Sequence, residues 1–121
     1  MKKYYLLLFG IIFTQVTLGQ QLTPDRTFVN YFYDSEAYMY EENYEAALDL
    51  LLKLEEMDPD NPNIWYKIGF CYLNTRLYKT KAQTYLEKAI EYVNPNYNSN
   101  SHRERSTPLE SYLYLGIAYR M

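Results

Sequence analysis

The sequence repeats itself with a period of about 34 residues, and this repeat limits the possible folds more than any other feature. Large apolar and small residues recur at matching places, and past residue 78 the second copy is one residue longer. The matched pairs are Tyr31 and Trp65, Tyr38 and Tyr72, Tyr44 and Tyr78, Ala47 and Ala82, Leu51 and Leu86, Leu54 and Ala89, and Pro59 and Pro95. A third copy starts with Tyr112, Leu115, Gly116 and Tyr119, which correspond to Trp65, Ile68, Gly69 and Tyr72. This pattern predicts a stack of small units that bury their apolar faces against each other.

The pattern within each copy is helical. In residues 43–57 the apolar side chains form a stripe at a spacing of about 3.6 residues, which is typical of an amphipathic helix. The stretch 58–62 then separates two helices: Pro59 ends the first, Asn61 can cap the next, and Pro62 suits its first turn. These signals predict pairs of helices joined by short turns.

The residues at these positions resemble the tetratricopeptide repeat (TPR), whose unit carries the pattern W-x2-L-G-x2-Y, then A-x3-F, then P. The second copy supplies the pattern best, with Trp65, Ile68, Gly69, Tyr72, Ala82, Leu86 and Pro95. The first copy departs from it early, at Tyr31, Asp34, Ser35 and Tyr38, and fits closely over residues 43–61. The resemblance covers residues 28–121.

The resemblance implies an all-α fold in which TPR helical hairpins stack as a short right-handed superhelix of about two and a half repeats. Its parts are repeat one (28–61), repeat two (62–95), a loop (96–107) and helix A of an incomplete third repeat (108–121). In the usual geometry of the repeat, Gly69 faces Ala82, so that two helix backbones come close. Most of the sixteen tyrosines are then structural rings between helices and not a cofactor site.

The last copy contains only its first helix. We therefore expect Tyr112, Leu115 and Tyr119 to keep an apolar side with too little to cover it, because each repeat buries its face against neighbours. We also expect the sequence to be the N-terminal piece of a longer protein.

Residues 94–107 form an insertion between the second and third copies. Asn, Ser and charged residues dominate it, which predicts an exposed loop. Thr107, Pro108 and Glu110 then fit a capping box with proline at the first helical position, so a helix is expected to start there.

Residues 1–19 have the composition of a secretory signal peptide. Lys2 and Lys3 precede an apolar run over residues 4–13, and Thr17 and Gly19 are small residues that suit a cleavage site. The apolar run is shorter than the roughly 20 residues that a membrane-spanning helix needs. We therefore expect export, with residues 20–27 as an N-terminal lead-in and no membrane span after cleavage.

The charge and the cysteine content exclude some classes of protein. The formal net charge is −3, and eleven of the fifteen acidic residues lie between Asp25 and Asp60. This acidity argues against a nucleic-acid partner, which requires a basic face. Cys71 is the only cysteine, so the chain forms no intrachain disulfide. We expect Cys71 to be a small buried residue, with a reactive thiol as the alternative.

Nothing in the sequence indicates an enzyme. His102 is the only histidine, and no cysteine or carboxylate stands at ligand spacing from it, so we expect a solvated loop residue and no metal site. The acidic pairs Glu41 and Glu42, and Glu55 and Glu56, are better explained as solvated helix faces than as an acid/base pair. Nucleophile and phosphate-binding motifs are missing as well. We predict no catalytic residues and no cofactor.

The TPR resemblance implies binding of a protein or peptide on a concave face lined by helix A of each repeat. An aromatic groove with a few charges suits an extended peptide or a partner helix. The groove positions of the repeat fall on Phe32, Tyr33, Glu36, Tyr40, Tyr66, Lys67, Phe70, Asn74, Tyr114 and Ile117.

A narrower resemblance rests on "NPNIWYKIGFCYLNT", "KTKAQTYLEKAIEYVNPNY" and "PLESYLYLGIAYR". These stretches are similar to the N-terminal repeat region of large envelope proteins of Bacteroidetes-type bacteria, which also carry a WD40-like (PD40) propeller and an OmpA-like peptidoglycan-binding domain. The resemblance implies a scaffold at the periplasm or outer membrane, with any peptidoglycan association residing in domains absent from this sequence. Two alternatives remain: a structural module that packs on its own parent protein, and the periplasmic sensor region of a membrane-bound signalling kinase.

Overall fold

The computed structural model describes residues 23–121, so the expected signal peptide lies outside the described residues. The chain divides into two units, residues 1–30 and residues 31–121. The first helix described, α2 (Thr23–Tyr40), begins inside the segment expected as a lead-in and runs into the second unit. In the part that the structure describes, no helix has both the length and the apolar character needed to cross a bilayer.

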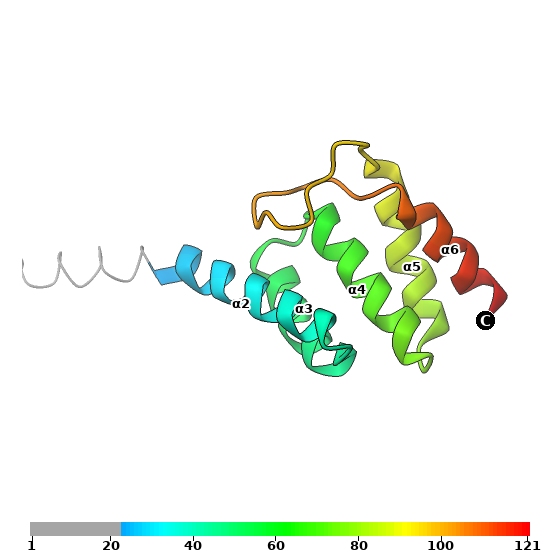
Figure 1. The fold of residues 1–121 in the computed structure, drawn as a ribbon, viewed down its shortest axis with the longest axis horizontal. Coiled ribbons are helices and arrows are strands. Elements are labelled where there is room, and N and C mark those ends of the chain that lie inside the picture. The colour runs from blue at the N-terminus through cyan, green and yellow to red at the C-terminus, as the bar shows by residue number, and fades with distance from the viewer. Residues whose placement is uncertain (1–22) are drawn as a thin grey trace, which may run out of the picture. The chain divides into compact units, whose positions relative to one another are not determined.

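The second unit is built from helices. After α2 come α3 (Tyr44–Met57), α4 (Pro62–Thr75), α5 (Lys79–Ala89), the 3-10 turn η1 (Ile90–Tyr92) and α6 (Glu110–Arg120). Residues 23–121 contain no β-strand, only an isolated bridge between Val93 and Thr107. Helix α4 packs against α3 and α5, and α6 lies against α5 and α4 (Figure 1). This arrangement confirms the all-α helical repeat fold; the handedness of the superhelix stays a prediction.

Local signals start and end the helices at the turn between α3 and α4. Helix α3 ends at Met57, and α4 begins at Pro62 with Asn61 as its N-cap. The Asn61 side-chain oxygen accepts a hydrogen bond from the Asn63 backbone N–H at 3.1 Å. A cap of this kind stabilises a helix by about 1 kcal/mol. The helix break predicted for residues 58–62 is therefore confirmed.

The core lies where α3, α4 and α5 meet. Leu51, Ile64, Ile68 and Leu86 are fully buried. Cys71 is fully buried as well, and burial raises the pKa of its thiol to about 12, so the thiol stays protonated at neutral pH. Its interpretation as a small buried residue is confirmed, because the reactive form of a cysteine is the thiolate.

Gly69 lies where α4 approaches α5 most closely. A Cβ atom added to Gly69 would lie 2.8 Å from Cγ of Leu86 and 3.3 Å from Cβ of Tyr85. The predicted close approach of α4 to α5 at Gly69 is confirmed, and the nearest atoms belong to Leu86 and Tyr85. Ala82 is fully buried on the same helix, and its predicted place opposite Gly69 stays a prediction.

The corners before α3 and after α4 use left-handed backbone. Glu42 has φ of 60° and Arg76 has φ of 58°. Neither residue is glycine, so each corner carries a backbone cost of about 1–2 kcal/mol.

Helix α6 covers one side of the stack and leaves another side open. Tyr112 and Tyr119 are 56% and 53% exposed, as expected for this helix. The same prediction was wrong for Leu115, which is buried because α6 packs against α5 and α4. Rings elsewhere pack between helices as predicted: Tyr72 lies 5.7 Å from Tyr78 and 6.0 Å from Tyr85 between ring centroids.

Candidate functional site

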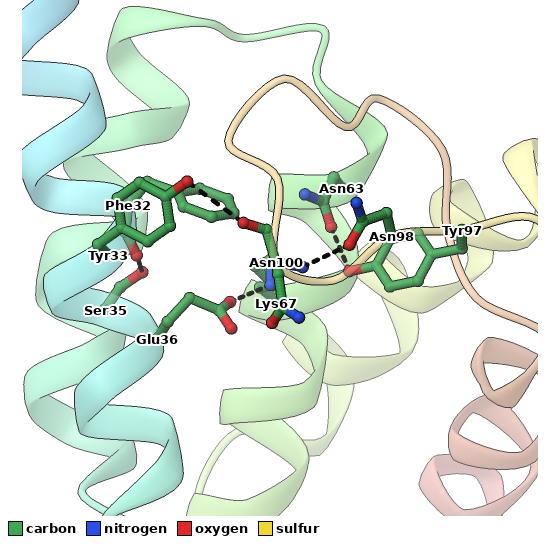
Figure 2. Close-up of polar contacts among 9 residues, drawn as sticks. All are labelled: Phe32, Tyr33, Ser35, Glu36, Asn63, Lys67, Tyr97, Asn98 and Asn100. Carbon is green, nitrogen blue, oxygen red and sulfur yellow. Dashed lines mark hydrogen bonds and ion pairs between the residues drawn. The ribbon is translucent and has the colours of Figure 1, made fainter.

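Helices α2 and α4 are the first helices of their hairpins, and α6 corresponds to them in the third copy. The surface that α4 and α6 share with residues 31–40 of α2 is called here the helix-A face. The insertion, residues 94–107, folds back over part of this face (Figure 2). The Tyr33 hydroxyl donates a hydrogen bond to the Asn100 carbonyl oxygen at 3.2 Å. The Tyr97 hydroxyl donates to the Asn63 side-chain oxygen at 2.6 Å. The predicted exposed loop is therefore exposed only in part, because its aromatic side chain docks onto α4.

The C-terminal end of the loop is fixed by hydrogen bonds. The Thr107 hydroxyl donates to the Ala89 carbonyl oxygen at 2.8 Å, and Thr107 itself is fully buried. Helix α6 begins at Glu110, and its N-cap, Leu109, makes no side-chain hydrogen bond. The predicted capping box was wrong, because the Thr107 hydroxyl is used by the free carbonyl at the end of α5. Arg105 adds an ion pair to Asp58 at 2.6 Å.

His102 of the loop packs against the rings of α2. Its ring centroid lies 6.5 Å from that of Phe32 and 5.9 Å from that of Tyr33. The prediction of a solvated loop histidine is confirmed only in part, because His102 lies in the loop but packs against these rings and is only partly accessible. Phe32 is fully buried, so its predicted place in an open groove was also wrong. Among the side chains of residues 26–121, no three His, Cys, Asp or Glu residues lie close enough to hold a metal ion.

A partly buried ion pair joins α2 to α4. The Lys67 ammonium group binds the Glu36 carboxylate; the side chains are 2% and 27% exposed, respectively (Figure 2). Lys67 Nζ also lies 5.1 Å from the centroid of the Phe32 ring. Burial lowers the pKa of Lys67, and the Glu36 carboxylate opposes this shift. Lys67 therefore holds the two helices together and does not offer its charge to a partner.

A pocket of about 550 Å³ opens between α2, α4, α6 and the loop, and it is called here the aromatic pocket. Its rings lie close together: the Phe70 and Tyr114 centroids are 5.0 Å apart, and those of Tyr66 and Tyr114 are 6.2 Å apart. The aromatic and charged side chains that line it, together with one methionine, are Glu36, Met39, Tyr66, Lys67, Phe70, Tyr97, Glu110 and Tyr114.

The aromatic pocket keeps its phenols protonated. Burial raises the pKa of Tyr66, and Tyr114 and the carboxylates of Glu110 and Glu36 raise it further. Burial raises the pKa of Tyr97 as well, and Tyr66 and the carboxylates of Glu36, Glu104 and Glu110 raise it further. These hydroxyl groups therefore act as neutral hydrogen-bond groups beside carboxylates.

A second pocket of about 460 Å³ continues along the helix-A face. It shares Phe70 and Tyr114 with the aromatic pocket and adds Asn74, Ile117 and Arg76. The Asn74 side-chain nitrogen donates to the Phe70 carbonyl oxygen at 2.8 Å, which orients the amide. The two pockets together form an interrupted groove along α4 and α6.

The structure brings together most of the predicted groove residues. Glu36, Tyr66, Lys67, Phe70 and Tyr114 line the aromatic pocket, and Asn74 and Ile117 line the second pocket. Tyr33 faces the loop, and Tyr40 is 90% exposed and lines neither pocket.

Of the eight side chains named above for the aromatic pocket, sequence reasoning missed three: Met39, Tyr97 and Glu110. Tyr97 is the only aromatic residue in the polar loop apart from His102. A single large ring in a polar segment could have indicated that the loop packs against the helices at this point. The sequence pattern at Glu110 indicated a capping box, and a capping box does not predict that the side chain lines a pocket.

Stacked helical hairpins with pockets on the face of their first helices define the class of helical-repeat proteins. Within that class, the family model described as TPR repeat matches residues 36–75, which run from α2 through α3 to the end of α4. The match supports the tetratricopeptide repeat family. Neither the curated proteins nor the solved structures contain a significant match to the chain.

Proposed function

We propose that the chain is a non-catalytic scaffold that binds an extended segment of a protein partner on the helix-A face. TPR repeats generally mediate protein–protein interaction. The observation that carries the proposal is the aromatic pocket, where Tyr66, Phe70 and Tyr114 remain in contact with solvent beside the fully buried core. Aromatic pockets with a few polar groups are typical of peptide recognition.

The test is a selection of random extended peptides displayed on phage against the immobilised chain. We expect the selection to enrich peptides whose binding is lost in the Tyr66→Ala, Phe70→Ala double variant. Tyr40→Ala is the matched control, because Tyr40 is 90% exposed and lines neither pocket. Circular dichroism checks that each variant is folded. If no enriched peptide depends on Tyr66 and Phe70, the proposal is wrong.

We further propose that the protein is exported and associated with the periplasm or outer membrane. The composition of residues 1–19 and the resemblance to envelope-protein repeats support this location. Cell fractionation with N-terminal sequencing of the purified protein tests it. A cytoplasmic protein that retains residues 1–19 would contradict it.

One observation favours a second function, a structural module that packs on its own parent protein. Helix α6 exposes Tyr112, Leu113, Ile117 and Tyr119, and Leu113 is 61% exposed. Apolar groups gathered on one helix suit contact with a neighbouring domain. In that case the peptide selection enriches nothing, and substitution of Leu113 by Lys disturbs the parent protein instead.

A further inference from the structure

The charges of the aromatic pocket do not balance. Of the residues that line it, three are charged: Glu36, Lys67 and Glu110. Lys67 is almost fully buried and paired with Glu36, so these two charges cancel. Within residues 31–121, the Glu110 carboxylate makes no hydrogen bond or ion pair, and Glu110 is exposed. The charge left for a ligand is therefore negative.

The rings add to this preference. The rings of Tyr66, Phe70 and Tyr114 lie 5.0–6.3 Å apart, measured between centroids. The face of an aromatic ring carries partial negative charge and attracts ammonium and guanidinium groups. An anion bound beside these rings would also be repelled by the Glu110 carboxylate.

The N-terminus of α6 has the opposite charge preference, because helix N-termini attract anions. Glu110 stands in the first turn of α6 and already supplies a negative charge at that position. The helix terminus therefore leaves the pocket's preference for a cation in place.

We propose that the aromatic pocket takes a Lys or Arg side chain of the bound peptide, with the cationic group beside Glu110 and the rings of Tyr66 and Tyr114. This inference rests on the proposed peptide-binding function. The preference is confined to one position of the peptide, because the neighbouring second pocket contains Arg76. The partner is thus a segment with one required basic residue and not a uniformly basic chain.

The test uses the peptides recovered in the selection on the full chain. We expect a Lys or Arg at one fixed position, and replacement of that Lys by norleucine should weaken binding. Glu110→Gln should weaken binding about two- to fivefold, the range for a single exposed charge pair. Glu41→Gln removes the same charge outside the pocket and should change little. Tyr114→Leu keeps apolar bulk but removes the aromatic face, and should also weaken binding about two- to thirtyfold.

The outcomes separate this inference from the proposed function. Enriched peptides that depend on Tyr66 and Phe70 but carry neutral or acidic residues, with no effect of Glu110→Gln, would overturn the basic-residue inference alone. A fall in affinity with added salt for wild type, and a weaker fall for Glu110→Gln, would support it. If no peptide depends on Tyr66 and Phe70, the peptide-binding function itself fails.

Discussion

Gly69 and Gly116 hold the same place in the repeat pattern, but their surroundings differ. A Cβ on Gly69 would lie 2.8 Å from Cγ and 3.0 Å from Cδ2 of Leu86, which is fully buried. A Cβ on Gly116 would meet no heavy atom within 4 Å. We therefore predict that the same substitution, glycine to alanine, changes stability in opposite directions at the two positions.

The magnitudes follow from two terms. Alanine in a helix interior is favoured over glycine by about 1 kcal/mol, and Gly116→Ala should gain this amount in full. Gly69→Ala has the same gain, but it forces extra volume into a packed core, which costs about 1–3 kcal/mol. Gly69→Ala should therefore lower the free energy of unfolding by up to about 2 kcal/mol. The difference between the two variants measures the contact with Leu86.

Urea unfolding followed by circular dichroism gives both free energies, and the slope of the transition checks that the folded and unfolded states are comparable. The double variant Gly69→Ala, Leu86→Ala is the control, because removing the Leu86 side chain should shrink the penalty at Gly69. If both single variants are stabilised equally, the close approach at Gly69 does not constrain that position. If Gly116→Ala destabilises the protein, the space beside α6 is not open.

Three further predictions concern the ion pair, a strained corner and the loop. Glu36→Gln leaves the buried Lys67 ammonium without its carboxylate and should lower the free energy of unfolding by up to about 3 kcal/mol. This loss should exceed the loss caused by Lys67→Met, which removes the buried charge itself. A larger loss for Lys67→Met would contradict the assignment of the buried charge. Arg76→Gly should be more stable than Arg76→Ala by about 1 kcal/mol in thermal unfolding, because glycine tolerates φ of 58°, and equal stability would refute the strain. Hydrogen bonds, chiefly from the Ser106 hydroxyl, lower the pKa of the Glu104 carboxyl group below its ordinary value of 4.5. The ionised carboxylate therefore stabilises the loop above pH 4.5, and this stabilisation is lost as the pH falls through the lowered pKa. The protection factors of the amides in residues 98–106, which are corrected for the intrinsic slowing of exchange in acid, should therefore fall as the pH drops through the lowered pKa, and Glu104→Gln should show no such step.

The parts of the fold that depend on neighbouring residues were predictable from the sequence. The cap at Asn61 and the proline at Pro62 act on the next turn of their own chain, so the start of α4 was predicted correctly. The hydrogen bond of Thr107 could not be predicted from neighbouring residues in this way. Its hydroxyl had two possible uses, the amide of the next helix or a carbonyl far back in the sequence, and the structure uses the carbonyl of Ala89.

The same distinction applies to the candidate site. Tyr66, Phe70 and Tyr114 were predicted because the groove positions of the TPR pattern fall on them, and a residue's position in a helix fixes the direction of its side chain. Phe32 follows the same rule, but His102 and the rest of the loop cover it, and no local pattern reveals that cover. The sequence indicated which residues face one side, but not which of them the loop leaves accessible.

The loop contacts also affect how the chain unfolds. Stacks of repeats that touch only their neighbours have mainly local contacts, and units at an end can unfold separately. The bond between Tyr33 and Asn100 spans 67 positions, and the bond between Asp58 and Arg105 spans 47. Such long-range contacts slow folding, because a large segment of chain must be closed before they form. They also join the first hairpin to the segment before α6, so residues 31–121 should unfold as one cooperative element and not as a row of separable hairpins.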